Sequence, residues 1–372
     1  MSLRYAAAAL AFVLCACSSS SGPKPTQLPR LEHEAQVRTL WSANIGGADR
    51  FVFAPALAEG SLYTAARNGT VTRFEAASGR VLWSVSAGTR LSGGVGADAR
   101  TVAVANEDGE VIALDAESGR RRWTARVSSE VIAVPAVGSD LVLVRSIDNR
   151  LFAFGAQDGK RRWVYQRAPS SLIIRAPAGV TIQGDTAFAG FAGGKLAAIA
   201  LSTGGVRWEA TVALPKGGTE LERVADVVGE PAVQGREVCA ATYQGRVGCY
   251  EAATGRQVWA RDVSSLTGVS LDARYAFVSD DRGAVQAFDR TNGRSVWKQD
   301  KLAHRQLSLP QPVGELVAVG DLEGYIHFLA RDTGAFVARY ATRGGPVRAA
   351  PTPIPGGLLV QTQNGALHAL AL

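Results

Sequence analysis

The feature that most constrains the fold of this chain is a short motif that recurs along nearly its whole length. The motif reads G-x-[VLI]-x-x-[FLY]-[DE]-x-x-[ST]-G-[RK]-x-x-W, as in Gly69–Trp83 and Gly109–Trp123. We call its first residue the turn position. It falls at 69, 109, 149, 194, 245, 283, 324 and 365. Steps of 38 to 51 residues are typical of proteins in which one structural unit is repeated.

All seven tryptophans occupy one register of this repeat, at 41, 83, 123, 163, 208, 259 and 297. Trp41 precedes the first copy, the seventh copy has Ala338 in its place, and the chain ends within the eighth copy. The segment around Trp41 is therefore predicted to supply the outer strand of the last unit. Such closure makes a ring, and four-stranded units of about 40 residues form propellers. We predict an all-β fold, an eight-bladed β-propeller over residues 36–372.

The pattern within one unit predicts its strands. In the first unit, residues 62–66 and 71–75 are separated by Asn68-Gly69, a pair that favours a turn with positive φ. Ser78-Gly79 predicts a second turn before the outer strand. A proline recurs 14 residues before the turn position, and proline is tolerated on edge strands. The strand that begins there is therefore predicted to be the innermost strand of the unit, which forms an edge of the blade. These prolines are Pro55, Pro135, Pro231, Pro310 and Pro351.

The recurring aromatic and acidic residues allow two interpretations. The tryptophans could stack a cofactor, but large amphipathic rings also fill the gaps between blades, and we favour packing. A set of acidic residues that precede the Ser/Thr/Asn-Gly turns could bind a ligand, but this place favours a turn-capping role. The set is Glu75, Asp115, Glu251 and Asp289.

The N-terminus has the pattern of an export signal. Arg4 precedes a nine-residue apolar run that is too short to span a bilayer, and small residues follow. Leu14-Cys15-Ala16-Cys17 resembles a bacterial lipobox, which makes residues 1–16 a signal peptide and Cys17 the lipidated residue. An ordinary signal with an incidental cysteine is the alternative. The polar, proline-rich stretch that follows favours a flexible tether, so residues 17–35 are assigned to the lipidated N-terminus and tether.

Composition and motifs exclude several classes of protein. No 18-residue apolar run occurs, which excludes a polytopic membrane protein. The net charge of +7 is spread along the chain, so it predicts no nucleic-acid arm. This charge is also a weak basis for the hypothesis that the protein binds cell-wall polymer. Only four histidines occur, and no hydrolase, zinc-protease or phosphate-loop motif is found. We therefore expect no catalytic residues, metal or cofactor.

The repeat [DE]-x-x-[ST]-G-x-x-x-W resembles the tryptophan-docking repeat of pyrroloquinoline quinone (PQQ) dehydrogenases. Those enzymes need a Ca²⁺ site, a catalytic Asp and commonly an adjacent pair of cysteines, and this shorter chain has no such pair. The lipobox, the tether, the eight blades and the strings at 222–227 and 320–325 resemble the BamB family, outer-membrane assembly lipoproteins of Gram-negative bacteria. A quinoprotein dehydrogenase-like propeller is kept as the alternative.

The resemblance to the BamB family implies a scaffold and not an enzyme. It implies a lipid-anchored subunit of the outer-membrane β-barrel assembly (BAM) complex that faces the periplasm. Such proteins bind the POTRA domains of BamA and assist the insertion of β-barrel proteins. Whether the propeller also contacts unfolded outer-membrane proteins stays open.

Two consecutive connections between units are longer than the others. From the tryptophan to the next turn position there are 31 residues after Trp163 and 37 after Trp208, against 24 to 27 after Trp83, Trp123, Trp259 and Trp297. Strand alternation predicts that both insertions lie side by side on one face. The first contains the apolar run Leu172-Ile173-Ile174 beside Arg175, which either marks a binding surface or folds back onto the ring. The second contains the charged residues Glu220, Glu222, Arg223 and Asp226.

The resemblance assigns a role to both insertions. In BamB-like proteins the BamA contact uses two Leu and one Arg on the first insertion and two Asp on the second. Leu172, Ile174, Arg175 and Asp226 match these positions, whereas Val228 stands at the second Asp position.

Two cysteines flank the turn of the fifth unit. With a three-residue loop at 243–245, Cys239 and Cys249 form a non-hydrogen-bonded pair within disulfide range, and an oxidising periplasm favours the bond. With a two-residue loop the register shifts and the two cysteines become diagonal neighbours.

Overall fold

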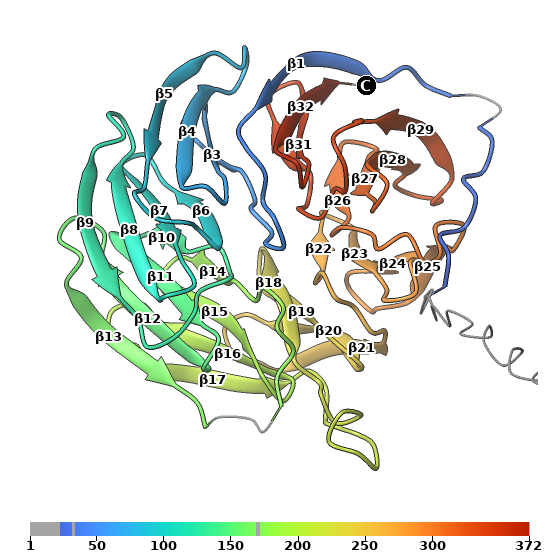
Figure 1. The fold of residues 1–372 in the computed structure, drawn as a ribbon. Coiled ribbons are helices and arrows are strands. Elements are labelled where there is room, and N and C mark those ends of the chain that lie inside the picture. Colours follow the sequence, from blue (N-terminus) through green and yellow to red (C-terminus); the bar gives the residue numbers. More distant parts are fainter. Residues whose placement is uncertain (1–22, 32–33, 169–171, 372) are drawn as a thin grey trace, which may run out of the picture.

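The computed structural model describes residues 23–31, 34–168 and 172–371. Its strands form eight four-stranded sheets, which stand as blades around a ring (Figure 1). The predicted all-β, eight-bladed propeller is confirmed. Cys17 and the predicted signal peptide lie outside the described residues. No helix in the described part of the chain is long and apolar enough to cross a membrane.

The first four blades follow one another along the chain, each from its inner to its outer strand. Blade 1 contains β2 (Ala56–Ala58), β3 (Ser61–Ala65), β4 (Thr70–Glu75) and β5 (Val81–Ser86). Blade 2 contains β6 (Gly93–Ala97), β7 (Thr101–Ala105), β8 (Glu110–Asp115) and β9 (Arg121–Arg126). Blade 3 contains β10 (Ala136–Gly138), β11 (Leu141–Ser146), β12 (Arg150–Gly155) and β13 (Arg161–Gln166). Blade 4 contains β14 (Val180–Gln183), β15 (Thr186–Phe191), β16 (Lys195–Ala200) and β17 (Val206–Thr211).

The next three blades have the same order, and the eighth takes one strand from the other end of the chain. Blade 5 contains β18 (Val227–Gln234), β19 (Glu237–Thr242), β20 (Arg246–Glu251) and β21 (Gln257–Asp262). Blade 6 contains β22 (Ser270–Leu271), β23 (Tyr275–Ser279), β24 (Val285–Asp289) and β25 (Ser295–Gln299). Blade 7 contains β26 (Gln311–Val313), β27 (Leu316–Gly320), β28 (Tyr325–Ala330) and β29 (Phe336–Ala341). Blade 8 contains β30 (Thr352–Ile354), β31 (Gly357–Gln361), β32 (Ala366–Ala371) and β1 (Arg38–Asn44).

The ring closes within blade 8. Strand β1 pairs antiparallel with β32, and Trp41 lies opposite Ala369. The predicted closure by the segment around Trp41 is therefore confirmed. Each recurring proline directly precedes an inner strand, except Pro231, which lies inside β18 where the ladder shifts register.

Each tryptophan packs on the turn before the outer strand of the following blade, which reads Ser-, Thr-, Asn- or Asp-Gly. The indole N–H of Trp123, for example, donates to the carbonyl oxygen of Ala156 at 2.9 Å. The ring lies against Gly159, where a Cβ atom would be only 2.6 Å from it. The same donor bond recurs at Trp41, Trp83, Trp163, Trp208, Trp259 and Trp297. The tryptophans therefore fasten blades to one another, as expected.

The exception at Ala338 has a structural reason. A tryptophan there would face blade 8, in which β1 comes from the other end of the chain, so no turn joins β32 to the outer strand. Ala338 is instead fully buried among apolar side chains of blades 7 and 8.

The recurring acidic residues cap their turns. Asp115 accepts hydrogen bonds from the backbone N–H of Ser118 at 2.8 Å and from its hydroxyl at 2.7 Å. The Arg122 guanidinium and these bonds hold the pKa of this carboxyl well below its usual range. In the described residues, no group of His, Cys, Asp and Glu side chains could hold a metal ion.

The segment before β1 was expected to be a flexible tether, but its described part is docked on blades 6 and 7. Thr26 donates its backbone N–H to the carbonyl oxygen of Ala303 at 3.1 Å, and Leu28 packs against the core between these blades. Two arginines of the propeller donate hydrogen bonds to backbone carbonyl oxygens of this segment. Arg305 donates to the carbonyl oxygen of Thr26 at 2.8 Å, and Arg339 donates to that of Pro29 at 3.0 Å.

Beneath this segment lies a buried polar cluster. Arg305 and His327 both contact one carboxylate oxygen of Asp321, at 2.7 Å and 2.9 Å, and all three side chains are buried. Arg339 lies 3.3 Å from the other ring nitrogen of His327. Burial lowers the pKa of His327, so the imidazole is neutral, whereas the bonds that Asp321 accepts from His327 and its other partners outweigh its burial and lower the pKa of the carboxyl.

Candidate partner-binding site

The two insertions lie side by side on one face of the ring. The first joins β13 to β14 and the second joins β17 to β18, and Figure 1 shows the second extending away from the blades. The backbone N–H of Gly229 donates to the carbonyl oxygen of Pro177 at 3.0 Å, and that of Gly179 donates to the carbonyl oxygen of Gly229 at 3.2 Å. The end of the first connection is therefore hydrogen-bonded to the start of β18, directly after the end of the second connection.

Asp226 ties the insertions together. Its side chain is buried, and one carboxylate oxygen accepts the backbone N–H of Ile174 at 2.7 Å. The other oxygen accepts the backbone N–H of Gly193 at 3.0 Å. Both oxygens are thus engaged within the chain. The expected contact of Asp226 with a partner stays a prediction, and the structure adds a role in holding the first insertion.

A second buried charge lies near Asp226. Burial lowers the pKa of Arg145 to about 10, and the negative charge of Asp226 is the largest effect that opposes this shift. Arg145 also packs over the ring of Phe191. The base of the insertions therefore contains two opposite charges, the buried Asp226 and the partly buried Arg145, which favours a single conformation of the loops above.

Arg175 belongs to an ionic network that sequence reasoning missed. Its guanidinium pairs with Glu130 and lies 3.7 Å from Glu107, which in turn pairs with Arg50 and Arg67. The Arg175 side chain is nevertheless 47% exposed. We call these five residues the charged cluster. The sequence does contain a pattern that could have indicated this cluster. The position 19 residues before the turn position holds Arg50, Glu130, Arg175 and Asp226 in four of the units.

Exposed apolar side chains accompany the charged cluster. Leu172 is 43% exposed and Ile173 is 39% exposed, whereas Ile174 is only half-buried. Sequence reasoning missed Leu214 and Leu221 on the second insertion, which are 65% and 69% exposed. Apolar side chains gathered on protruding loops are typical of a surface that contacts another protein.

Val228 occupies the position where the resemblance expected a second acidic residue. It is buried in β18 and lies opposite Ala241 of β19. This position is thus part of the core of blade 5.

Cys239 and Cys249 lie opposite each other on β19 and β20. The loop between these strands has the three-residue form, with positive φ at Gln244. The Cα atoms of the two cysteines are 4.0 Å apart, and a disulfide joins their sulfur atoms. Both side chains are fully buried in the core shared by blades 5 and 6, which favours a structural role.

Comparison with known proteins gives one family repeatedly. A family profile described as "Outer membrane protein assembly factor BamB" matches residues 67–299. A relative of that name from Bordetella pertussis is 44% identical over 345 residues, which cover 92% of this chain and 89% of the relative. Another from Burkholderia pseudomallei is 39% identical over 372 residues and covers 98% of this chain and 97% of the relative.

Solved structures give the same result. The crystal structure of BamB from Moraxella catarrhalis has a TM-score of 0.83 at 26% sequence identity, and the match covers 91% of this chain and 100% of that chain. A quinohemoprotein alcohol dehydrogenase from Comamonas testosteroni has a TM-score of 0.71 at 13% identity, with 90% and 76% covered. The second likeness extends to the fold alone.

Proposed function

This chain belongs to the BamB family of outer membrane protein assembly factors, and from this premise we propose that it is a non-enzymatic scaffold subunit of the BAM complex. In this role it binds the periplasmic POTRA domains of BamA and assists insertion of β-barrel proteins into the outer membrane. The alternative, a PQQ-dependent dehydrogenase, is supported only by likeness of fold at 13% identity.

The observation that carries the proposal is the surface formed by the two insertions. It combines exposed Leu172 and Ile173 with the partly exposed guanidinium of Arg175. Binding hot spots commonly consist of an apolar anchor and an arginine at the centre of a contact. Leu172 would fill an apolar pocket of the partner, while Arg175 would bind a partner carboxylate.

Asp226 prepares this surface for binding. Because its carboxylate fixes the backbone of Ile174, the loop does not have to be ordered when the partner arrives. Ordering a loop on binding costs free energy, so a loop held in advance binds more tightly. Asp226 would thus support the contact even where its own oxygens do not reach the partner.

Substitution of two residues tests the binding surface. In a pull-down from outer-membrane extract, Leu172→Asp and Arg175→Glu should each reduce BamA recovery by about tenfold or more, as expected for hot-spot residues. Leu172→Asp leaves the ionic network untouched, so it separates loss of contact from rearrangement of Glu130 and Glu107. Arg120→Glu, the same charge change on the opposite face, is the matched control. Full BamA recovery by an Ile174→Asp, Arg175→Glu double variant would show that this surface is not the site.

We also propose that Cys17 carries the lipid anchor. Two or more acyl chains hold a protein stably on a membrane, whereas one chain binds only marginally. Wild-type protein should fractionate with the outer membrane, and Cys17→Ser should release the protein or leave it unprocessed. Recovery of all wild-type protein in the soluble periplasmic fraction would exclude this anchor.

A further inference from the structure

The centre of the ring contains a cavity that the proposed function does not use. Its volume is about 640 Å³, within the range of pockets that bind small ligands. The inner edges of most blades form its walls, and much of the wall is apolar, as at Val52, Val134 and Leu309. Ile174 and Arg175 stand where this cavity meets the first insertion.

The repeat shows which residue type the walls normally require. One residue per blade stands 15 positions before the turn position: Ala54, Gly94, Val134, Gly179, Glu230, Gly268, Leu309 and Ala350. Seven of these residues are small or apolar, and most of the set lines the cavity. Glu230, on blade 5, is the exception. The fold itself therefore gives no reason for a carboxylate there.

The same comparison singles out a residue of opposite charge. The residues 17 positions before the turn position are Val52, Ser92, Ile132, Pro177, Val228, Leu266, Leu307 and Arg348. Only Arg348 is charged, and it lines the cavity from blade 8, three blades away from Glu230. Two departures from the repeat, of opposite sign, thus face one cavity.

Neither charge is used to hold the protein together. Within the described part of the chain, the Glu230 carboxylate and the Arg348 guanidinium make no hydrogen bond and no ion pair, either with each other or with another group. Both side chains are open to the cavity. Desolvation by the surrounding walls raises the pKa of Glu230 to about 7, although its side chain is open to the cavity. Both charged groups are thus free to bind a ligand that enters the cavity.

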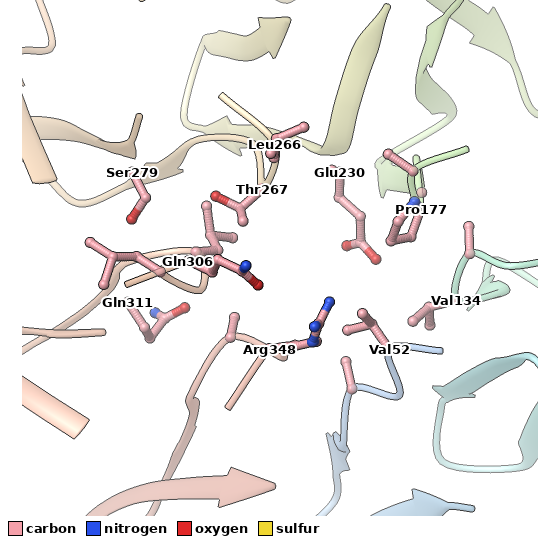
Figure 2. Close-up of a pocket in the computed structure, with 18 of the residues that line it drawn as sticks. Val52, Val134, Pro177, Glu230, Leu266, Thr267, Ser279, Gln306, Gln311 and Arg348 are labelled. Carbon is pink, nitrogen blue, oxygen red and sulfur yellow. The ribbon is translucent and has the colours of Figure 1, made fainter. Parts of the chain in front are cut away.

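Two further residues of the cavity wall also depart from ordinary backbone geometry or side-chain packing. The side chain of Glu230 lies directly over Gly179 of blade 4, where a Cβ atom would overlap its Cγ atom. Gln306 has a backbone φ of +48°, a conformation that glutamine rarely adopts, and its amide reaches the cavity. Figure 2 shows Glu230, Arg348 and Gln306 pointing from different sides toward the same central space.

We propose that this cavity binds a short zwitterionic peptide by its two ends. Glu230 binds the terminal ammonium group, Arg348 binds the terminal carboxylate, and Gln306 hydrogen-bonds to the peptide backbone between them. The ligand has to carry two separated charges, because Glu230 and Arg348 face the cavity from different sides. The apolar wall between them suits small side chains such as those of alanine.

Calorimetric titration of the purified protein with di- to hexa-alanine tests the proposal. At least one length should bind, and the length that binds most tightly reports the separation of the two charges. Glu230→Gln and Arg348→Gln should each weaken binding of this peptide by about tenfold or more, as expected for loss of a hydrogen bond between charged groups. Glu117→Gln and Arg38→Gln, which change exposed residues on the outside of the ring, are the matched controls and should bind as the wild type does.

Blocked peptides assign each end. N-acetylation should weaken binding to the wild type but cause no further loss in Glu230→Gln, and C-amidation should behave in the same way with Arg348→Gln. Absence of binding by all five lengths would overturn the proposal. Equal affinity of the wild type and both variants would also overturn it. So would a further loss of affinity on N-acetylation in Glu230→Gln, or on C-amidation in Arg348→Gln. Recovery of BamA by Glu230→Gln should be unchanged, which separates this site from the insertion surface.

Discussion

At the scale of single residues, the buried cluster around His327 links stability to pH. Asp321, Arg305 and Arg339 face the imidazole, which burial keeps neutral in the folded protein. In the unfolded chain the same histidine takes up a proton near its ordinary pKa of about 6.5. The unfolded state therefore binds more protons below that pH, and the folded state loses stability as the pH falls.

This linkage gives a direct prediction. Between pH 7 and pH 5, thermal unfolding of the wild type should shift to lower temperature, and His327→Gln should reduce that shift because no proton is taken up at this position. The exposed His304, replaced by Asn to suit its positive φ, is the control and should leave the shift unchanged. An unaltered pH dependence in His327→Gln would contradict the assignment.

Sequence reasoning was successful for residues whose place the repeat determines. The tryptophan positions and the opposition of Cys239 and Cys249 follow from strand register, which is local and periodic. The partners of Arg175 were missed because Glu130 and Glu107 belong to other blades, and no local pattern predicts which charges meet across a ring. Burial of Asp226 was missed for the same reason, since its acceptor role depends on the backbone of another insertion.

At the scale of elements, the contact between a tryptophan and a glycine turn is the unit that joins blades. Trp123→Ala should destabilise the protein by about 3–5 kcal/mol, because it removes a large buried ring and leaves a cavity. Trp123→Phe should cost less, since it keeps most of the packing and loses the hydrogen bond to Ala156. Urea unfolding monitored by circular dichroism measures both variants.

The glycine on which the tryptophan ring packs provides a second test of this contact. Gly159→Ala should also destabilise, because its Cβ would collide with the Trp123 ring and its φ of +64° disfavours other residues. Gly235→Ala is the control, since Gly235 has a similar φ of +62° but no atom lies where its Cβ would be. Equal stability of the two glycine variants would show that strain, and not the collision, dominates.

Elements outside the repeat were predicted less completely. The two long connections were located from spacing alone, but their exposed Leu214 and Leu221 carry no periodic signal. The docking of residues 26–31 and 34–35 was not expected, because a polar, proline-rich composition favours flexibility. It says nothing about the arginines that donate hydrogen bonds to the carbonyl groups of this segment.

At the scale of the whole molecule, the ring depends on one pairing between the two ends of the chain. A variant that lacks residues 36–44 should expose the edge of β32, and an exposed edge strand invites association with another chain. We therefore expect this variant to self-associate in gel filtration and to unfold at lower urea concentration than the wild type. A peptide of residues 36–46 added in excess should restore the monomer, and a monomeric variant without the peptide would contradict the role of β1.

The pairing of β1 with β32 also sets an order in time. Seven blades can form as soon as their own four strands are available, but the first strand has to wait for the last one to be made. During synthesis, the protein therefore exists as an open array of blades with an unpaired leading strand, and long-range pairing of this kind is slow. Until β32 has been made the ring stays open, and only its completion joins the two ends of the array.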